Sequence, residues 1–174
     1  MTIKNNPADD VISIIVPCFN EESVLPAFYS AVSDAASSIE GAVCEFLFID
    51  DGSSDRTAEI LQHFTEKDER VRFLTFSRNF GKEAAMYAGL QNASGDYCVF
   101  MDADLQHDPA VLRAMIERLE ADPSLDIAIA SRFVEGGGTG DWDVPIGGMG
   151  VVSGGMERAA RAAGAKLVTG AEVT

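Results

Sequence analysis

The sequence predicts an α/β protein with a mainly parallel, doubly wound sheet, and three observations favour this fold class. Short apolar runs alternate with segments in which apolar residues recur at helical spacing, which is typical of repeated strand-helix units. The apolar runs are rich in β-branched and aromatic residues, as expected for strands buried on both faces. Polar residues follow these runs directly, so each strand is expected to end in a loop.

The first two strand-helix units are expected in the N-terminal third of the chain. Residues 11–16 predict a buried strand, and apolar residues at helical spacing over residues 24–39 predict the helix that follows it. Residues 46–49 predict a second strand, after which Ser54 or Asp55 can cap a helix. The buried stripe of that helix is expected to consist of Ile60, Leu61 and Phe64.

Two further units and a last strand complete the expected sheet. Strands are expected at residues 71–76, 96–101 and 126–130. Residues 82–91 predict one helix, and Asp108 with Pro109 can start another. That helix would bury Val111, Leu112, Met115, Ile116 and Leu119. Five strands alternating with four helices imply right-handed crossovers, and ligands of such sheets bind outside the carboxyl ends of the strands.

Composition excludes several classes of function. The chain has 174 residues and a formal net charge of -15 at pH 7, so nucleic acid is not an expected partner and a polyphosphate ligand would need a bridging metal. The cysteines are Cys18, Cys44 and Cys98, each within an apolar run. They are expected to be reduced core residues of a cytoplasmic protein. No apolar stretch approaches the ~20 residues of a transmembrane helix.

Two acidic residues close the fourth apolar run. Asp102 and Asp104 follow residues 96–101 directly, so both carboxylates are expected where a buried strand ends. Mg²⁺ and Mn²⁺ prefer oxygen ligands, often one or two carboxylates together with substrate phosphates. The expected ligand is therefore a metal diphosphate. For an isolated Asp-x-Asp the commoner arrangement is that one carboxylate caps a turn and the other faces water.

Other strand ends are expected to add side chains to the same edge of the sheet. These are residues 17–21, Asp50 and Asp51, and Gln106. Asp51 and Glu21 can accept hydrogen bonds from a base or ribose, and Phe19 offers a flat face for stacking. A turn with a helix cap is the alternative for residues 50–53, and core packing is the alternative for Phe19.

A basic loop precedes the third expected helix. Arg78 and Lys82 lie within residues 77–82 and can face phosphate oxygens. The alternative is a solvated loop without a ligand.

Five short segments resemble, in order and spacing, the successive motifs of family 2 glycosyltransferases. The segments are residues 16–21, 49–55, 78–82, 101–107 and 131–133. The resemblance is closest to the polyprenyl-phosphate subgroup, which includes dolichol-phosphate mannosyltransferases and bactoprenol glucosyltransferases. It implies the GT-A fold, a Rossmann-like nucleotide-sugar-binding domain.

The resemblance also implies an activity and a site. A sugar would pass from a UDP- or GDP-sugar to an acceptor, expected to be a polyprenyl phosphate, with inversion at the anomeric carbon. The nucleoside site would be lined by Pro17, Phe19, Glu21, Ile49 and Asp51, with Ala103 and Lys82 also on the donor. Asp102, Asp104 and Gln106 would surround Mg²⁺ or Mn²⁺, and Arg132 would contact the diphosphate. Asp102, Asp104 and Arg132 are the expected catalytic residues, whereas His107 is expected to orient Asp104 or to cap a helix.

The resemblance ends near residue 143, where the composition becomes rich in Gly and Ala. We therefore expect a flexible N-terminus over residues 1–10, a donor-binding core over residues 11–143 and an atypical tail over residues 144–174. The tail, for which a helix over 157–163 and a strand over 165–169 are expected, resembles a fragment of flavin-dependent desaturases and amine oxidases.

Such a chain would be a truncated glycosyltransferase, incomplete at the C-terminus. A nucleotide-sugar-binding remnant without turnover and a fragment of a flavin-dependent oxidoreductase are the alternatives. A polyprenyl acceptor would allow peripheral contact with the inner face of a membrane.

Overall fold

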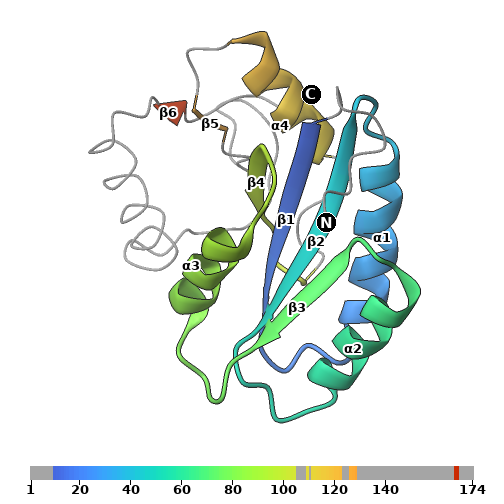
Figure 1. Cartoon of the computed structure of the whole chain (residues 1–174), viewed down its shortest axis with the longest axis vertical. Helices are drawn as coiled ribbons and strands as arrows, with labels where there is room; N and C mark the ends of the chain where they lie inside the picture. The colour runs from blue at the N-terminus through green and yellow to red at the C-terminus, as the bar shows by residue number, and fades with distance from the viewer. Residues whose placement is uncertain (1–9, 105–108, 110, 123–125, 129–166, 169–174) are drawn as a thin grey trace, which may run out of the picture. The chain divides into compact units, whose positions relative to one another are not determined.

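Four strands form a parallel sheet, and three helices connect them (Figure 1). The computed structural model describes residues 10–104, 109, 111–122, 126–128 and 167–168. The chain divides into two units, Met1–Pro109 and Ala110–Thr174. The elements of the first unit are β1 (Asp10–Cys18), α1 (Leu25–Ser37), β2 (Ala42–Asp50), α2 (Thr57–Lys67), β3 (Val71–Thr75), α3 (Lys82–Asn92) and β4 (Tyr97–Phe100).

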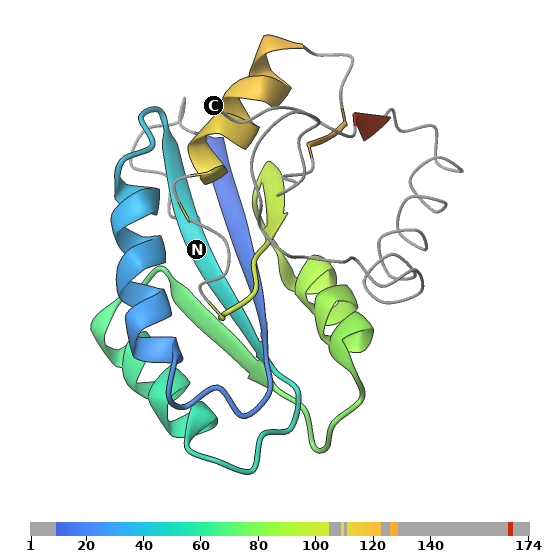
Figure 2. The same cartoon turned by 180° about the vertical axis from the view of Figure 1, so that it is seen from behind.

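The order of the strands is β3-β2-β1-β4, so the sheet is doubly wound as predicted. The chain runs outward from β1 to β3 and then returns through α3 to place β4 on the other side of β1. Because parallel crossovers are right-handed, this reversal places α3 on the face opposite α1 and α2. Figures 1 and 2 show α1 and α2 together and α3 apart from them. The carboxyl ends of β1 and β4 therefore flank a topological switch point, where ligands of such sheets bind.

Aromatic side chains fill the space between the sheet and helices α1 and α2. Phe46 and Phe48 point from β2 to this face, and the Phe28 and Phe48 rings meet edge to face at 6.4 Å. The Tyr29 ring stacks on that of Phe64 at 4.4 Å. Because Phe28 and Tyr29 come from α1 while Phe64 comes from α2, these contacts join both helices to the sheet.

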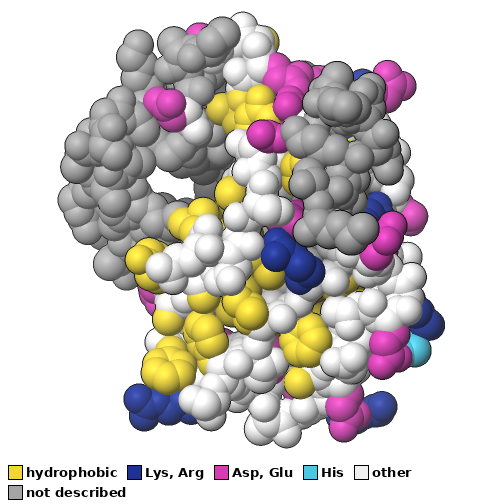
Figure 3. Space-filling model, in the orientation of Figure 1, with side chains coloured by type: hydrophobic (Ala, Val, Ile, Leu, Met, Phe, Trp, Pro, Cys, Tyr) yellow, Lys and Arg dark blue, Asp and Glu magenta, His cyan; other side chains and the backbone are white. Residues whose placement is uncertain are grey.

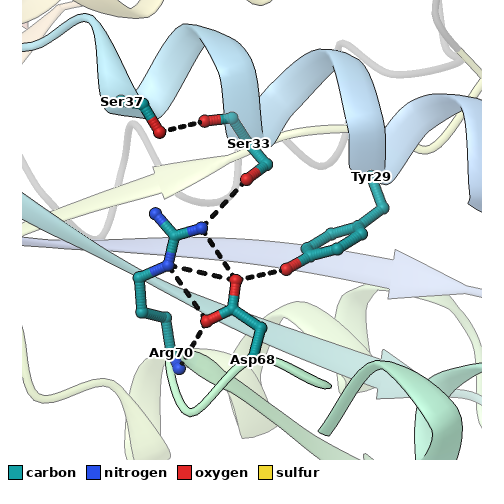
Figure 4. Close-up of polar contacts among 5 residues, drawn as sticks. All are labelled: Tyr29, Ser33, Ser37, Asp68 and Arg70. Carbon is teal, nitrogen blue, oxygen red and sulfur yellow. Dashed lines mark hydrogen bonds and ion pairs between the residues drawn. The ribbon is translucent and has the colours of Figure 1, made fainter.

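A polar cluster extends this packing at the turn before β3 (Figure 4). Asp68 accepts hydrogen bonds from the Tyr29 hydroxyl and from Arg70, whose Nη2 lies 2.7 Å from Asp68 Oδ2. The same Nη2 donates to Ser33 Oγ at 2.9 Å. Burial alone would raise the pKa of Asp68, but the hydrogen bonds from Arg70 and Tyr29 outweigh it and lower the pKa to about 2. The cluster therefore holds α1 against the start of β3 with an ionised carboxylate.

The opposite face of the sheet packs against α3. Ile15, Leu47, Ile49 and Ala85 form its buried centre. Gly89 lets the helix approach closely, since a Cβ atom there would lie 2.2 Å from Ile15 Cγ2. A small residue is therefore required at this position in α3.

A buried carboxylate fastens the far end of α3. Glu45 is 2% exposed and accepts hydrogen bonds from Ser13 Oγ, from the backbone N–H and hydroxyl of Ser94, and from Arg72. Burial opposes ionisation, but the hydrogen bonds from Ser13 and Ser94 lower the pKa of Glu45. The carboxylate thus ties the connection after α3 to the sheet.

The second unit contains α4 (Val111–Ala121), β5 (Ile127–Ala128) and β6 (Leu167–Val168). The sequence placed residues 126–130 as a fifth strand of the main sheet, and this was wrong for the residues described, because β5 pairs in parallel with β6 in a separate two-stranded sheet. Alternation of strands and helices predicts a strand but does not specify its neighbour. The short strand expected over residues 165–169 is confirmed at β6, while the helix expected over 157–163 lies outside the described residues.

Two further details concern the expected core and the membrane. Cys18 and Cys44 are buried as predicted, but Cys98 is exposed, because β4 pairs with β1 on one edge and has no second strand among the described residues. None of the described helices is both long enough and apolar enough to cross a bilayer.

Candidate functional site

The loops that follow β1, β2 and β4 emerge at one edge of the sheet. Cys18 and Asp50 are paired in the register of β1 and β2, and the backbone N–H of Asp51 donates to the Cys18 carbonyl at 2.8 Å. On the other side of β1, the N–H of Met101 donates to the Ile15 carbonyl at 3.0 Å. The segments that carry Glu21, Asp51 and Asp102 therefore begin side by side, as the sequence predicts.

Hydrogen bonds join the loop after β1 to the loop after β2. Asn20, which adopts a left-handed backbone with φ of 56°, donates its N–H to Ser53 Oγ at 2.9 Å and accepts from the Ser54 N–H at 2.9 Å. The N–H of Glu21 donates to Thr57 Oγ1 at 2.9 Å. The two loops thus form one wall of the site.

Asp51 connects that wall to the basic loop before α3. Its Oδ1 accepts the Phe80 N–H at 2.7 Å, and its Oδ2 accepts the Gly81 N–H at 2.8 Å. Gly52 allows the contact, because its φ is +70° and a Cβ atom would lie 2.4 Å from the Arg78 carbonyl carbon. Asp51, only 4% exposed, therefore holds the basic loop in place.

The basic loop presents an aromatic side chain and a cation to solvent. The Arg78 guanidinium lies 4.7 Å from the centroid of the Phe80 ring, and Phe76 meets the same ring edge to face at 5.5 Å. Phe80 is 52% exposed, and Tyr87 and Leu90 of α3 are exposed as well. Hydrophobic side chains accordingly appear on the face that α3 occupies (Figure 3).

Lys82, the first residue of α3, forms an ion pair with Asp102. Its Nζ lies 2.6 Å from Asp102 Oδ1 and 2.8 Å from Asp102 Oδ2. Both side chains are partly exposed. The ammonium group therefore contacts both oxygens of one of the two carboxylates that the sequence predicts to hold a metal.

Negative charge from separate strand ends converges around this pair. Burial and the charges of Asp104, Asp55 and Asp102 raise the pKa of Glu21, which places a carboxylate from the end of β1 close to those that follow β4. Burial, reinforced by the charges of Glu21, Asp50 and Asp102, likewise raises the pKa of the Cys18 thiol. The acidic side chains thus share one region.

Asp50 lies beneath this region. It is fully buried, its Oδ1 accepts the Ser53 N–H at 3.0 Å, and its Oδ2 has no hydrogen-bond partner within the described part of the chain. This turn is the alternative considered for residues 50–53, and it holds for Asp50, whereas Asp51 reaches across to the basic loop.

The donor atoms suit a hard divalent cation. Among the described residues there is no group of three or more His, Cys, Asp or Glu side chains that could hold a metal ion. The two carboxylates of Asp102 and Asp104 match the one or two that Mg²⁺ takes when substrate phosphates and water complete its coordination. These residues therefore fit Mg²⁺ or Mn²⁺ bound together with a diphosphate.

The remaining predicted site residues differ in their placement. Phe19 is 45% exposed, and Pro17 is half-buried. Ile49 and Ala103 are buried, and Ile49 belongs to the core beneath α3, so its side chain is held away from a ligand. Gln106, His107 and Arg132 lie outside the described residues. The ion pair between Lys82 and Asp102 was not predicted from the sequence, because a separation of 20 positions offers no periodic signal for it.

The parallel sheet and its helices form an α/β fold of the GT-A type, which solved glycosyltransferases share. A mannosyltransferase from Pyrobaculum calidifontis, solved in complex with GDP-Man and Mn²⁺, superposes with a TM-score of 0.58 at 22% identity, over 68% of this chain and 34% of that one. The chain belongs to Glycosyl transferase family 2, whose sequence profile matches residues 13–170.

Curated relatives share more of the sequence. The chain is 41% identical over 121 residues to the bactoprenol glucosyl transferase of Shigella phage SfV, and the match covers 70% of this chain and 38% of the relative. It is 37% identical over 131 residues to the dolichol-phosphate mannosyltransferase of Pyrococcus furiosus, over 75% of this chain and 36% of the relative. The chain thus matches well under half the length of these relatives.

The family match bears on the C-terminal tail. It continues to residue 170 and so includes most of the segment that resembles flavin-dependent oxidoreductases. Family membership therefore favours the transferase over the oxidoreductase, and the domain boundary at residue 144 stays a prediction.

Proposed function

We propose that this chain provides the donor site of a glycosyltransferase that moves a sugar from a nucleotide diphosphate to a polyprenyl phosphate, with inversion at the anomeric carbon. The observation that carries the proposal is that the segments bearing Glu21, Asp51 and Asp102 begin side by side at the carboxyl ends of β1, β2 and β4. The names of the curated relatives support a polyprenyl acceptor.

The donor would lie across the switch point of the sheet. Phe19 would stack on the base, while Glu21 and Asp51 would accept hydrogen bonds from the nucleoside. Pro17 and the backbone near Ile49 and Ala103 would complete this part of the site. Each Asp51 oxygen already accepts one backbone N–H, and a carboxylate oxygen has a second lone pair for a ligand.

The diphosphate would lie against the acidic and basic side chains. Asp102 and Asp104, with Gln106, would hold Mg²⁺ or Mn²⁺, which supplies positive charge where negative charge develops on the leaving group. Lys82 and Arg132 would contact phosphate oxygens. An acceptor phosphate oxygen would form a bond to C1 of the sugar while the bond from C1 to the diphosphate oxygen breaks. Because a phosphate acceptor is anionic near neutral pH, the reaction needs no strong general base.

The acceptor places the reaction at a membrane surface. A polyprenyl phosphate is anchored in the bilayer, so the domain would work in the cytoplasm at the inner face of the membrane.

Calorimetric titration with UDP-glucose and with GDP-mannose, each with and without Mn²⁺, tests the donor site. We expect heat with at least one donor that requires Mn²⁺ and that disappears in the double variant Asp102→Ala/Asp104→Ala. The variant Asp34→Ala/Glu40→Ala, which removes two exposed carboxylates at α1 and the turn after it, is the matched control. Absence of metal-dependent heat with every donor would contradict the proposal. Formation of a polyprenyl-linked sugar from labelled donor separates transfer from binding alone.

A further inference from the structure

Lys82 occupies a position where a lysine does not help its own helix. It is the first residue of α3, and the unpaired N–H groups at a helix N-terminus disfavour a positive charge there. Its ammonium instead contacts both oxygens of Asp102, at 2.6 and 2.8 Å. The contact with Asp102 therefore accounts for the lysine better than helix stability does.

The surrounding charges favour this contact. Burial and the charges of Asp104 and Asp102 raise the pKa of Glu21, so the Asp102 carboxylate that Lys82 contacts belongs to an acidic region. The Asp51 carboxylate fixes the Phe80 and Gly81 backbone just before Lys82. The start of the lysine side chain is thus held in place, and the side chain as a whole is 39% exposed.

We propose that Lys82 is a positioning residue that couples binding of the metal to binding of the diphosphate, by neutralising Asp102 until the diphosphate takes over its ammonium group. The inference rests on the proposed function. A divalent cation and the ammonium repel each other when both contact the same carboxylate oxygens, so the metal alone must displace Lys82. A diphosphate brings oxygens that bind both cations, which removes this competition.

The coupling has a defined thermodynamic signature. If Lys82 competes with the metal for Asp102, diphosphate must raise the affinity for metal, and metal must raise the affinity for diphosphate by the same factor. Replacing the lysine by a neutral side chain should strengthen binding of metal alone and weaken binding of diphosphate. The stronger binding of metal alone reduces the coupling factor, which is the metal affinity with diphosphate divided by the metal affinity without it.

The test is titration of the full chain with Mn²⁺, followed by the electron paramagnetic resonance signal of free Mn²⁺, alone and with saturating UDP or GDP. For wild type we expect UDP or GDP, whichever binds more tightly, to raise the Mn²⁺ affinity roughly tenfold or more. In Lys82→Met, Mn²⁺ alone should bind about threefold tighter or better, and the coupling should fall to about threefold or less. Lys82→Arg keeps the charge and should retain most of the coupling, while Lys67→Met, at the end of α2, should behave as wild type.

The outcomes separate this inference from the proposed function. Unchanged coupling in a Lys82→Met protein whose thermal unfolding matches wild type would overturn the role of Lys82 and leave the donor site standing. Weaker binding of Mn²⁺ alone in that variant would overturn it as well. If wild type bound no Mn²⁺ with either nucleotide, both the inference and the proposed function would be wrong.

Discussion

The backbone N–H of Gly81 donates a hydrogen bond to the carboxylate of Asp51 at 2.8 Å, across 30 positions of sequence. With the neighbouring bond from Phe80, it places the start of α3 beside the carboxyl end of β2. Replacing Asp51 by Asn exchanges one acceptor oxygen for an NH₂ group that faces a backbone donor.

We expect Asp51→Asn to lower the free energy of unfolding by about 2 kcal/mol, because a partly buried backbone donor loses its charged partner. Urea unfolding measures the change. Asp34→Asn, on the exposed side of α1, is the control and should change stability by less than about 0.5 kcal/mol. A similarly small effect of Asp51→Asn would mean that the loop is held by other contacts.

Gly89→Ala tests the close packing of α3 on the sheet. Alanine favours the helix by about 1 kcal/mol relative to glycine, but its Cβ atom would lie 2.2 Å from Ile15 Cγ2. Overpacking of a core costs about 1–3 kcal/mol, so we expect a net loss of about 1 kcal/mol in urea unfolding.

The sign of the effect should reverse when the obstructing side chain is removed. In an Ile15→Ala background, Gly89→Ala should stabilise the protein by up to about 1 kcal/mol, because only helix propensity then remains. If Gly89→Ala destabilised both backgrounds equally, contact with Ile15 would not be the cause.

The pKa of Asp68 predicts a dependence of stability on acid. The folded pKa is about 2, against an ordinary value of 3.8, so the unfolded chain binds more protons between these values and stability rises with pH there. The contribution is complete above pH 4 and is lost as pH falls through about 2.

Urea unfolding from pH 2 to pH 5 measures this dependence. We expect Asp68→Asn to be less stable than wild type at pH 5, with the difference shrinking toward pH 2. Tyr29→Phe removes one of the two side chains that donate to the carboxylate. In a Tyr29→Phe background, Asp68→Asn should therefore cost less stability at pH 5 than it does in wild type. Parallel stability curves for wild type and Asp68→Asn would contradict a depressed pKa.

Phe19 tests the proposed nucleoside site without disturbing the core. Because the side chain is 45% exposed, Phe19→Ala should leave the free energy of unfolding within about 0.5 kcal/mol of wild type. Loss of stacking on a base should weaken nucleotide binding about tenfold, as measured by calorimetry. Tyr87→Ala, an exposed aromatic on α3, is the control and should bind nucleotide as wild type does.

Periodic patterns predicted the parts of the fold that burial dictates. The runs that became β1 and β2 are apolar because both faces of these inner strands are covered. Helices α1 and α2 show an apolar stripe that packs on the sheet. The segment at residues 46–49 predicted β2 but not its earlier start at Ala42, since Ala42 and Val43 lie at the less buried end of the strand.

The periodic patterns did not predict contacts between segments that are distant in the sequence. The Asp50 and Asp51 pair predicted a site, yet the sequence could not indicate that one carboxylate turns back to Ser53 while the other reaches Phe80 and Gly81. Pairing of Ile127–Ala128 with Leu167–Val168 and exposure of Cys98 also depend on which strands become neighbours, which no local period encodes.

Helix α3 is anchored at both of its ends by buried carboxylates. Asp51 accepts a hydrogen bond from the backbone just before the helix begins, and Glu45 accepts hydrogen bonds from Ser94 shortly after the helix ends. A helix held by hydrogen bonds at both ends cannot translate along the sheet when a ligand binds. Any response at Lys82 must therefore come from rotation about the bonds of its own side chain, a motion of nanoseconds at a partly exposed position.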